Sequence, residues 1–160
     1  MTEIKADEYW AKKGDVDLFI FRKRLTASEN APVLFMVHGS SFSGPTGFDL
    51  QVPGREDYSQ MDRSARAGFD VWTLDHEGYG QPPRTDGNSG IASGVEDLKA
   101  GFDVITRETG LTAALFYGSS SGALRAATYA EARPDAVTRL VLDAFVWTGE
   151  DAPTLIKRAE

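Results

Sequence analysis

The stretch 115–123 constrains the fold of this chain more than any other part of its sequence. An apolar run of β type leads directly into Gly118-Ser119-Ser120-Ser121-Gly122, and an alanine-rich segment of helical type follows. A strand, a tight turn and a helix in this order, with a serine between two glycines, are typical of a nucleophile elbow. A side chain at either glycine would clash with the neighbouring strand or helix. The pattern therefore predicts a strained turn that exposes Ser120 above a sheet.

The rest of the chain alternates β-type runs with helical periodicity after an antiparallel start. This order is typical of an α/β fold with a mostly parallel central sheet and flanking helices. About six strands are expected, at 9–12, 16–25, 33–37, 69–75, 113–117 and 137–142. Helices are expected at 59–67, from a Ser93–Glu96 capping box to Gly110, and at 123–133. Glycine and proline predict a long irregular loop at 42–58.

The composition excludes several classes of function. The 160 residues are enough for one domain, and a net charge of −7 argues against nucleic acid and anionic membranes as partners. No stretch approaches the ~20 apolar residues of a membrane span, and the N-terminus lacks an apolar signal core, so we expect a cytoplasmic protein. The chain has no cysteine, and its two histidines, His38 and His76, lack metal-ligand spacing. No metal or cofactor is implied.

A glycine-rich turn between a strand and a helix can also bind phosphate. The turn at 118–122 does not match Gly-x-Gly-x-x-Gly, and no Gly-Lys-Ser/Thr follows it. The sequence therefore favours neither a dinucleotide site nor a P-loop.

Three motifs each follow a predicted strand, and together they identify a family. They are His38-Gly39, Asp75-His76-Glu77-Gly78-Tyr79-Gly80 and the glycine–serine turn at 118–122. In this order and approximate spacing they resemble the N-terminal half of an α/β-hydrolase, over residues 9 to 143. The resemblance implies that residues 1–145 are the N-terminal part of a hydrolase core without its last strands. Residues 146–160 would then begin a lid segment.

The resemblance also implies roles for single residues. Ser120 would be the nucleophile, and Ser121 and Ser40 would each offer a backbone N–H to an oxyanion. Asp143 stands where a minority of these folds place the acid of the triad. The implied reaction is hydrolysis of a carboxylic ester or lactone, a small-molecule substrate, through an acyl-serine intermediate. Fixed N–H donors suit this chemistry because negative charge develops on the carbonyl oxygen during acyl transfer.

The pattern lacks a histidine after Ser120, where this superfamily places its general base. Three explanations stay open. The chain could be part of a larger enzyme, truncated, cleaved or made of two chains, whose second part completes the sheet and supplies acid and base. It could be a short protein with an inactive or repurposed fold, a scaffold that binds a small apolar ligand or a protein partner. It could also use His76 as the base of an unusual triad.

Two further expectations concern the surroundings of the site. Asp75, Glu77 and Arg84 are expected to pin a loop by ion pairing. An open, apolar sheet edge at 137–142 invites pairing with another chain, so we expect poor solubility or dependence on a partner. Five loop aromatics near the expected mouth of the site could line an apolar pocket or pack under a lid: Phe42, Phe48, Tyr79, Phe145 and Trp147.

Overall fold

A six-stranded sheet in the order β1-β2-β4-β3-β5-β6 forms the centre of the molecule. The computed structural model describes residues 3–27, 30–55, 58–81, 86, 89–146, 150, 153 and 156–157. Strands β3 to β6 run parallel to one another, and β1 and β2 form an antiparallel hairpin joined to β4. This confirms the α/β fold with a mostly parallel sheet. The strands are β1 (Ile4–Lys13), β2 (Val16–Leu25), β3 (Val33–Val37), β4 (Asp70–Leu74), β5 (Ala114–Ser119) and β6 (Val137–Asp143).

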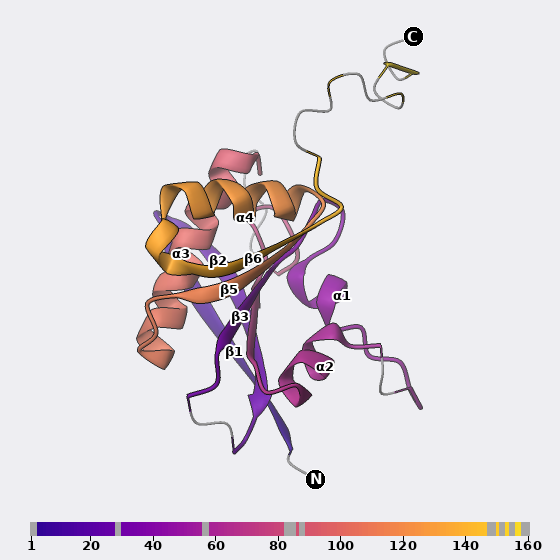
Figure 1. The fold of residues 1–160 in the computed structure, drawn as a ribbon, viewed down its shortest axis with the longest axis vertical. Helices are drawn as coiled ribbons and strands as arrows, with labels where there is room; N and C mark the ends of the chain where they lie inside the picture. Colours follow the sequence, from indigo (N-terminus) through magenta and orange to yellow (C-terminus); the bar gives the residue numbers. More distant parts are fainter. Residues whose placement is uncertain are drawn as a thin grey trace.

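Helices cover both faces of the sheet. In Figure 1, α3 and α4 lie on one face, and α1 and α2 lie on the other. The sheet therefore separates two apolar cores, a larger one beneath α3 and α4 and a smaller one beneath α1 and α2. The helices are α1 (Gly44–Phe48), α2 (Gln60–Arg66), α3 (Ile91–Thr109) and α4 (Ser121–Ala132), and a 3₁₀ turn, η1 (Pro134–Ala136), precedes β6.

The central strands are apolar without interruption because both of their faces are buried. In β3, Val33, Phe35 and Val37 point into the larger core, whereas Met36 points into the smaller one. Successive side chains of a strand alternate between the two faces, so a strand covered on both sides has no polar positions to fill. The carboxyl ends of β3, β4 and β5 therefore meet at one edge of a rigid sheet.

The loop predicted at 42–58 contains a short helix, and that part of the prediction is wrong. Helix α1 begins at Gly44 and carries a proline in its first turn. Ser43 and Thr46 cap it reciprocally, since the Ser43 backbone N–H donates to Thr46 Oγ1 at 3.0 Å. Glycine and proline do not break a helix at its first positions, where the backbone N–H groups have no intrahelical partner in any case.

Two other boundaries differ most from the predictions. Helix α3 begins at Ile91 with Gly90 as its N-cap and without a side-chain cap, so the Ser93–Glu96 capping box is wrong. Strand β1 begins at Ile4, five residues before the predicted start. Its mixed polar and apolar residues hide the strand signal, because this edge strand is partly exposed on both sides.

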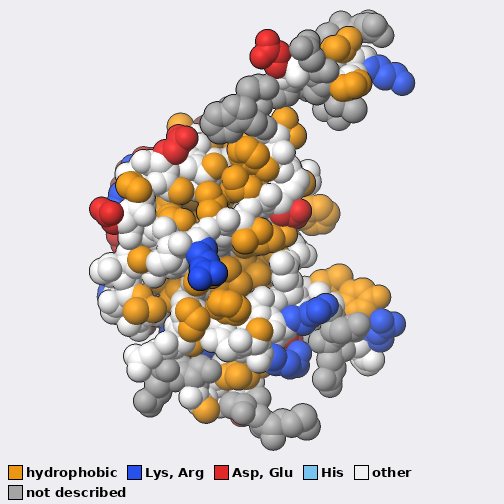
Figure 2. All heavy atoms as spheres, in the orientation of Figure 1, with side chains coloured by type: hydrophobic (Ala, Val, Ile, Leu, Met, Phe, Trp, Pro, Cys, Tyr) orange, Lys and Arg blue, Asp and Glu red, His pale blue; other side chains and the backbone are white. Residues whose placement is uncertain are grey.

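Strand β6 forms one edge of the sheet, and its side chains are largely apolar. Val141 is 54% exposed, and Figure 2 shows apolar side chains gathered over the face on which β6 lies. Of the predicted lid segment, only Val146, Glu150, Pro153, Ile156 and Lys157 fall within the described residues. Among the helices that the structure describes, none is long and apolar enough to cross a membrane.

Candidate active site

Ser120 occupies a strained turn between β5 and α4. Its φ of 56° and ψ of −125° lie in a region that residues other than glycine rarely adopt. The Ser120 backbone N–H donates to the carbonyl oxygen of Asp143 at 2.9 Å, which ties the turn to the end of β6. The Ser120 side chain is exposed and does not cap α4. Its hydroxyl is therefore presented outward, as the sequence predicts.

The two glycines of the turn are required by their neighbours. A Cβ at Gly118 would lie 2.5 Å from the carbonyl oxygen of Gly122, and a Cβ at Gly122 would lie 2.5 Å from that of His38. Both obstacles are backbone atoms, so they cannot move aside as the end of a flexible side chain could. A third glycine, Gly39, is equally constrained, since its Cβ would lie 2.8 Å from the carbonyl oxygen of Ser119. The loop after β3 can approach the turn only because these residues lack side chains.

Ser40 and Ser121 lie together beside this turn. Ser40 follows β3, Ser121 is the first residue of α4, and their hydroxyl oxygens are 2.9 Å apart. Arg125, one turn further along α4, donates from Nη1 to the carbonyl oxygen of His38 at 3.3 Å and to Ser121 Oγ at 3.4 Å. The side chain of Arg125 is buried, and burial lowers its pKa. Arg125 thus joins the loop after β3 to the start of α4.

His38 holds this loop with both of its ring nitrogens. Nδ1 donates to the carbonyl oxygen of Gly39 at 2.7 Å, and Nε2 accepts the backbone N–H of His76 at 3.1 Å. Burial, followed by the neighbouring His76, lowers the pKa of His38 to about 3. The ring is therefore neutral, with its single proton on Nδ1. A ring engaged at both nitrogens has no free site at which to accept the proton of Ser120.

His76 lies deeper in the fold than Ser120. Its ring has no exposed area, and Nδ1 donates to Asp97 Oδ2 at 3.0 Å. Nε2 has no hydrogen-bond partner among the described residues, and burial lowers the pKa of this ring. His76 does not line the pocket at Ser120. Neither histidine is placed as a base for Ser120 in the part of the chain that the structure describes.

A pocket of about 340 Å³ opens beside Ser120. Two of the five predicted aromatics line it, the exposed Phe42 and the buried Phe48. Tyr79 instead packs its ring edge-on against His38, with centroids 5.2 Å apart, and Phe145 is not among the lining residues. Trp147 lies outside the described residues. The pocket is lined by His38, Gly39, Ser40, Phe42, Gly47, Phe48, Ser119 and Ser120.

Asp143 lies against the turn from the side of β6. Its Oδ2 accepts hydrogen bonds from the hydroxyl of Tyr117 at 2.9 Å and from that of Ser119 at 3.2 Å. Burial and then the Asp143 carboxylate raise the pKa of Tyr117. The carboxylate is thus close to Ser120 in the fold, but no described histidine is bonded to it.

The predicted ion pairing after β4 is seen for Glu77, whereas Asp75 holds its loop through hydrogen bonds from backbone N–H groups. Asp75 accepts the backbone N–H of Gly44 at 2.8 Å and that of Gln81 at 3.0 Å, so it anchors both α1 and its own loop. Glu77 pairs with Lys13 at 2.6 Å. Arg84, the third member of the predicted cluster, lies outside the described residues. Within those ranges, no group of three His, Asp or Glu side chains is arranged to hold a metal ion.

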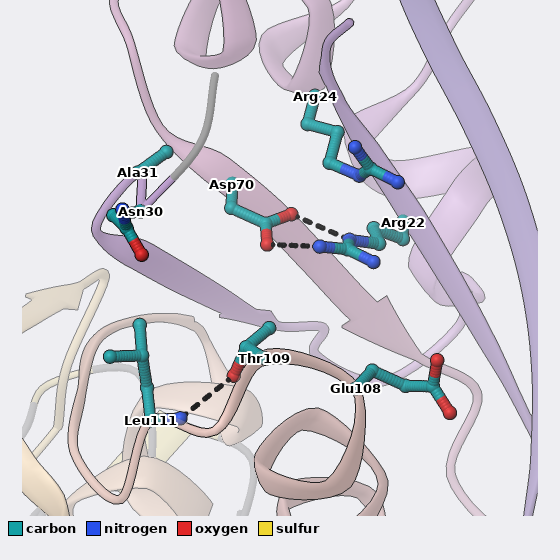
Figure 3. Close-up of a pocket in the computed structure, with 8 residues that line it drawn as sticks. All are labelled: Arg22, Arg24, Asn30, Ala31, Asp70, Glu108, Thr109 and Leu111. Carbon is teal, nitrogen blue, oxygen red and sulfur yellow. Dashed lines mark hydrogen bonds and ion pairs between the residues drawn. The ribbon is translucent and has the colours of Figure 1, made fainter. Parts of the chain in front are cut away.

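A second pocket, of about 390 Å³, lies at the opposite end of the parallel strands (Figure 3). There the guanidinium of Arg22 is paired with both oxygens of Asp70, at 2.8 and 2.6 Å, and its third nitrogen donates to Tyr9. All three guanidinium nitrogens of Arg22 are therefore engaged within the protein. This pocket is far from Ser120 because Asp70 begins β4, whereas Ser120 follows the end of β5.

Sequence reasoning missed three charged residues behind the site: Lys13, Asp97 and Arg125. Asp97 and Arg125 are fully buried, although charged residues seldom are. The sequence did contain a sign of this for Asp97, because this residue falls on the apolar face of α3 with Leu98 and Phe102. A charged residue on a core-facing helical stripe is a sign of a buried polar network.

Comparisons with solved structures agree with this fold. The structure is similar to a CIB-like hydrolase from Thermoplasma acidophilum (TM-score 0.65, 16% identity, 86% of this chain and 62% of that one). It is similar to an epoxide hydrolase from Vigna radiata (TM-score 0.71, 16% identity, 96% and 46%). It is also similar to a thioesterase domain from the curacin biosynthetic pathway (TM-score 0.63, 21% identity, 96% and 50%). The chain thus spans about half to two thirds of these structures, which share its fold.

No curated protein matches the sequence. A family model does: that of the serine aminopeptidases, S33, matches residues 56–159, which include the turn at Ser120. The match covers more than half of the chain and agrees with the sheet order, the strained serine and the fold of the similar structures. The chain therefore belongs to the serine aminopeptidase S33 family of the α/β-hydrolase superfamily.

Proposed function

We propose that Ser120 is the nucleophile of a hydrolase that cleaves a carboxylic ester or lactone through an acyl-serine intermediate. The observation that carries the proposal is the exposed hydroxyl of Ser120 on a backbone with φ of 56°, at the start of α4 and on the wall of a pocket of about 340 Å³. Strain of this kind persists only where the surroundings enforce it, and it is concentrated at functional sites.

The chemistry proceeds in two halves. Ser120 Oγ attacks the carbonyl carbon while a base takes its proton, and the carbonyl oxygen becomes an oxyanion. The intermediate then collapses, the bond to the leaving oxygen breaks, and the base returns the proton to that oxygen. Water repeats the sequence on the acyl-serine and regenerates Ser120.

Two backbone N–H groups, those of Ser40 and Ser121, are the proposed oxyanion donors. Their side chains meet at 2.9 Å, and Ser121 opens a helix of 12 residues whose positive dipole end points to the same place. Removing one such donor typically lowers kcat by about 10²–10³-fold. The family supports a hydrolase with a serine nucleophile, since its description is that of serine aminopeptidases.

The base and, we propose, the acid come from outside this chain. No described histidine reaches Ser120, and β6 leaves an apolar edge beside it. A polypeptide that pairs with β6 would complete the sheet and bring its side chains to the same edge as Ser120. Asp143 is the alternative candidate for the acid, because its exposed carboxylate ends β6 next to the turn.

A non-catalytic scaffold that binds a small apolar ligand or a protein partner is the second candidate. This candidate is favoured because no base for Ser120 lies among the described residues. Ester turnover by the protein, with its completing polypeptide present, separates the two. Ser120→Ala is expected to lower kcat by about 10⁴-fold or more. Ser119→Ala, the matched control on the neighbouring hydroxyl, is expected to stay within about tenfold. Equal activity of both variants would leave the scaffold as the function.

A further inference from the structure

A buried polar network lies behind the loop that carries Ser40. We propose that Asp97 and Lys13 are positioning residues, which act through His76 and His38 to aim the Ser40 N–H at the oxyanion. The inference rests on the proposed function of Ser40 as an oxyanion donor. It adds residues from α3 and β1, neither of which touches the pocket.

The peptide group between Gly39 and Ser40 is held in one orientation. The carbonyl oxygen of Gly39 and the N–H of Ser40 belong to the same planar peptide, so fixing one fixes the direction of the other. The ring of His38 donates to this carbonyl from Nδ1 at 2.7 Å. The Ser40 N–H must then point away from His38, on the opposite side of the peptide.

His76 and Asp97 in turn hold the ring of His38. Its Nε2 accepts the N–H of His76, and that backbone segment is fixed by Asp97. Asp97 Oδ2 accepts from the His76 ring at 3.0 Å and from the Glu77 backbone N–H at 3.2 Å. One carboxylate oxygen thus binds a side chain and the adjacent peptide, which leaves His76 little freedom to turn.

Lys13 helps to keep Asp97 ionised. Its side chain is fully buried, and Lys13 contacts its other oxygen while also pairing with Glu77 at 2.6 Å and donating to Ser93 at 3.1 Å. Burial works to raise the pKa of Asp97, but His76 and Lys13 outweigh it and lower the pKa. A buried carboxylate without such a partner would be strongly destabilising.

The network has a defined proton arrangement that can be measured without any variant. Both rings carry their proton on Nδ1, His38 toward Gly39 and His76 toward Asp97. The chain has only two histidines, so long-range ¹H–¹⁵N correlation spectra contain four ring nitrogens. We expect an unprotonated Nε2 on both rings at pH 7. A proton on Nε2 of His38 would overturn the proposal.

Lys13→Met tests the electrostatic link. The groups that face His76 are Lys13 from β1, Asp97 from α3, Arg125 from α4 and His38 after β3. Without Lys13, the negative charge of Asp97 is left for His76 to balance, so we expect His76 to titrate at a higher pH than in the unaltered protein. Lys12→Met is the matched control, since Lys12 pairs with Asp17 on the surface. An unchanged His76 titration in Lys13→Met contradicts the proposal.

Asp97→Asn tests the consequence at the loop. We expect faster amide hydrogen exchange at Ser40 and a fall in kcat of about tenfold to a hundredfold with little change in KM, because oxyanion contacts act only in the transition state. Asp103→Asn, an exposed position on the same helix, should change neither. Unaltered exchange at Ser40 in folded Asp97→Asn would overturn the proposal. If the unaltered protein has no ester turnover, the proposed function fails, and the ring spectra and amide exchange still decide this inference.

Discussion

The turn at Ser120 and the edge strand β6 are neighbours in space, yet they are built in opposite ways. They meet where the Ser120 N–H donates to the carbonyl oxygen of Asp143. The turn is enclosed by backbone atoms on every side that a glycine faces, whereas Val141 in β6 is 54% exposed. The proposed nucleophile is thus fully supported on the side of the described core and open on the side of β6.

The opposite edge of the sheet shows that the exposure of β6 is not a general property of edges in this protein. Half of the residues of β1 are charged, and ion pairs such as Lys5–Asp7 and Lys12–Asp17 cover its surface. Strand β6 has only Arg139 and Asp143 as charged residues. Edges that face water are usually protected by charge, so the apolar composition of β6 supports our proposal that another chain segment pairs with this strand.

We expect Gly122→Ala, in the turn, to have the largest effect on stability. Its Cβ would collide with the backbone of Val37 and His38, so we expect the free energy of unfolding to fall by about 3 kcal/mol. Gly47→Ala is the control, because its Cβ would meet only the Cβ of Phe42 at 3.9 Å. Alanine in a helix should be neutral or slightly stabilising there. Equal losses in urea unfolding would contradict the account of the turn.

Acid should weaken the side of the molecule behind the turn. His38 is neutral in the folded protein because burial lowers its pKa to about 3, whereas the unfolded chain takes up a proton near pH 6.5. The unfolded state therefore binds more protons, and stability falls as the pH drops from 7 to 5, by about 2 kcal/mol from His38 alone. The lowered pKa of His76 acts in the same direction. The raised pKa of Asp75 acts in the opposite direction, because this carboxyl binds a proton more readily in the folded protein and so offsets part of the loss. Urea unfolding at pH 7, 6 and 5 measures the slope, and a flat profile would show that the two rings are not held neutral.

Tyr117→Phe tests the contact between the turn at Ser120 and strand β6. The hydroxyl of Tyr117 donates to Asp143 at 2.9 Å, so its removal should cost about 1 kcal/mol of unfolding free energy. Tyr58→Phe is a suitable control, since Tyr58 is 49% exposed and should be neutral. No difference between the variants would mean that this bond does not hold the turn against β6.

Val141→Lys should have the smallest effect on stability and a clear effect on association. The side chain is exposed, so the free energy of unfolding should change by less than about 0.5 kcal/mol. A charge on an apolar edge opposes pairing with other strands, and we expect less self-association by light scattering. Ala6→Lys, which adds the same charge to the already charged β1 edge, should leave association unchanged. Identical behaviour of the two variants would remove the distinction between the edges.

The sequence predicts the strands and the turn at Ser120 because each depends on a local pattern. Continuous apolar runs mark strands buried on both faces, and two glycines mark a turn that admits no side chain. The network behind Ser40 could not be predicted, since Lys13, His76 and Asp97 come from separate segments that meet only in the fold. Helix α1 was not predicted because Gly44-Pro45 is typical of a loop. Only the cap formed by Ser43 and Thr46 identifies this dipeptide as the start of a helix.

We propose above that Ser120 is the nucleophile that becomes acylated, and that its base lies outside this chain. Labelling with an alkyl fluorophosphonate, followed by peptide mass spectrometry, tests it most directly. For the 160-residue chain alone we expect no adduct above that of Ser120→Ala. With the completing polypeptide present, we expect one adduct, on Ser120. Rapid labelling of Ser120 in the chain alone would show that the base is already within it, and an adduct on any other residue would contradict the assignment of the nucleophile.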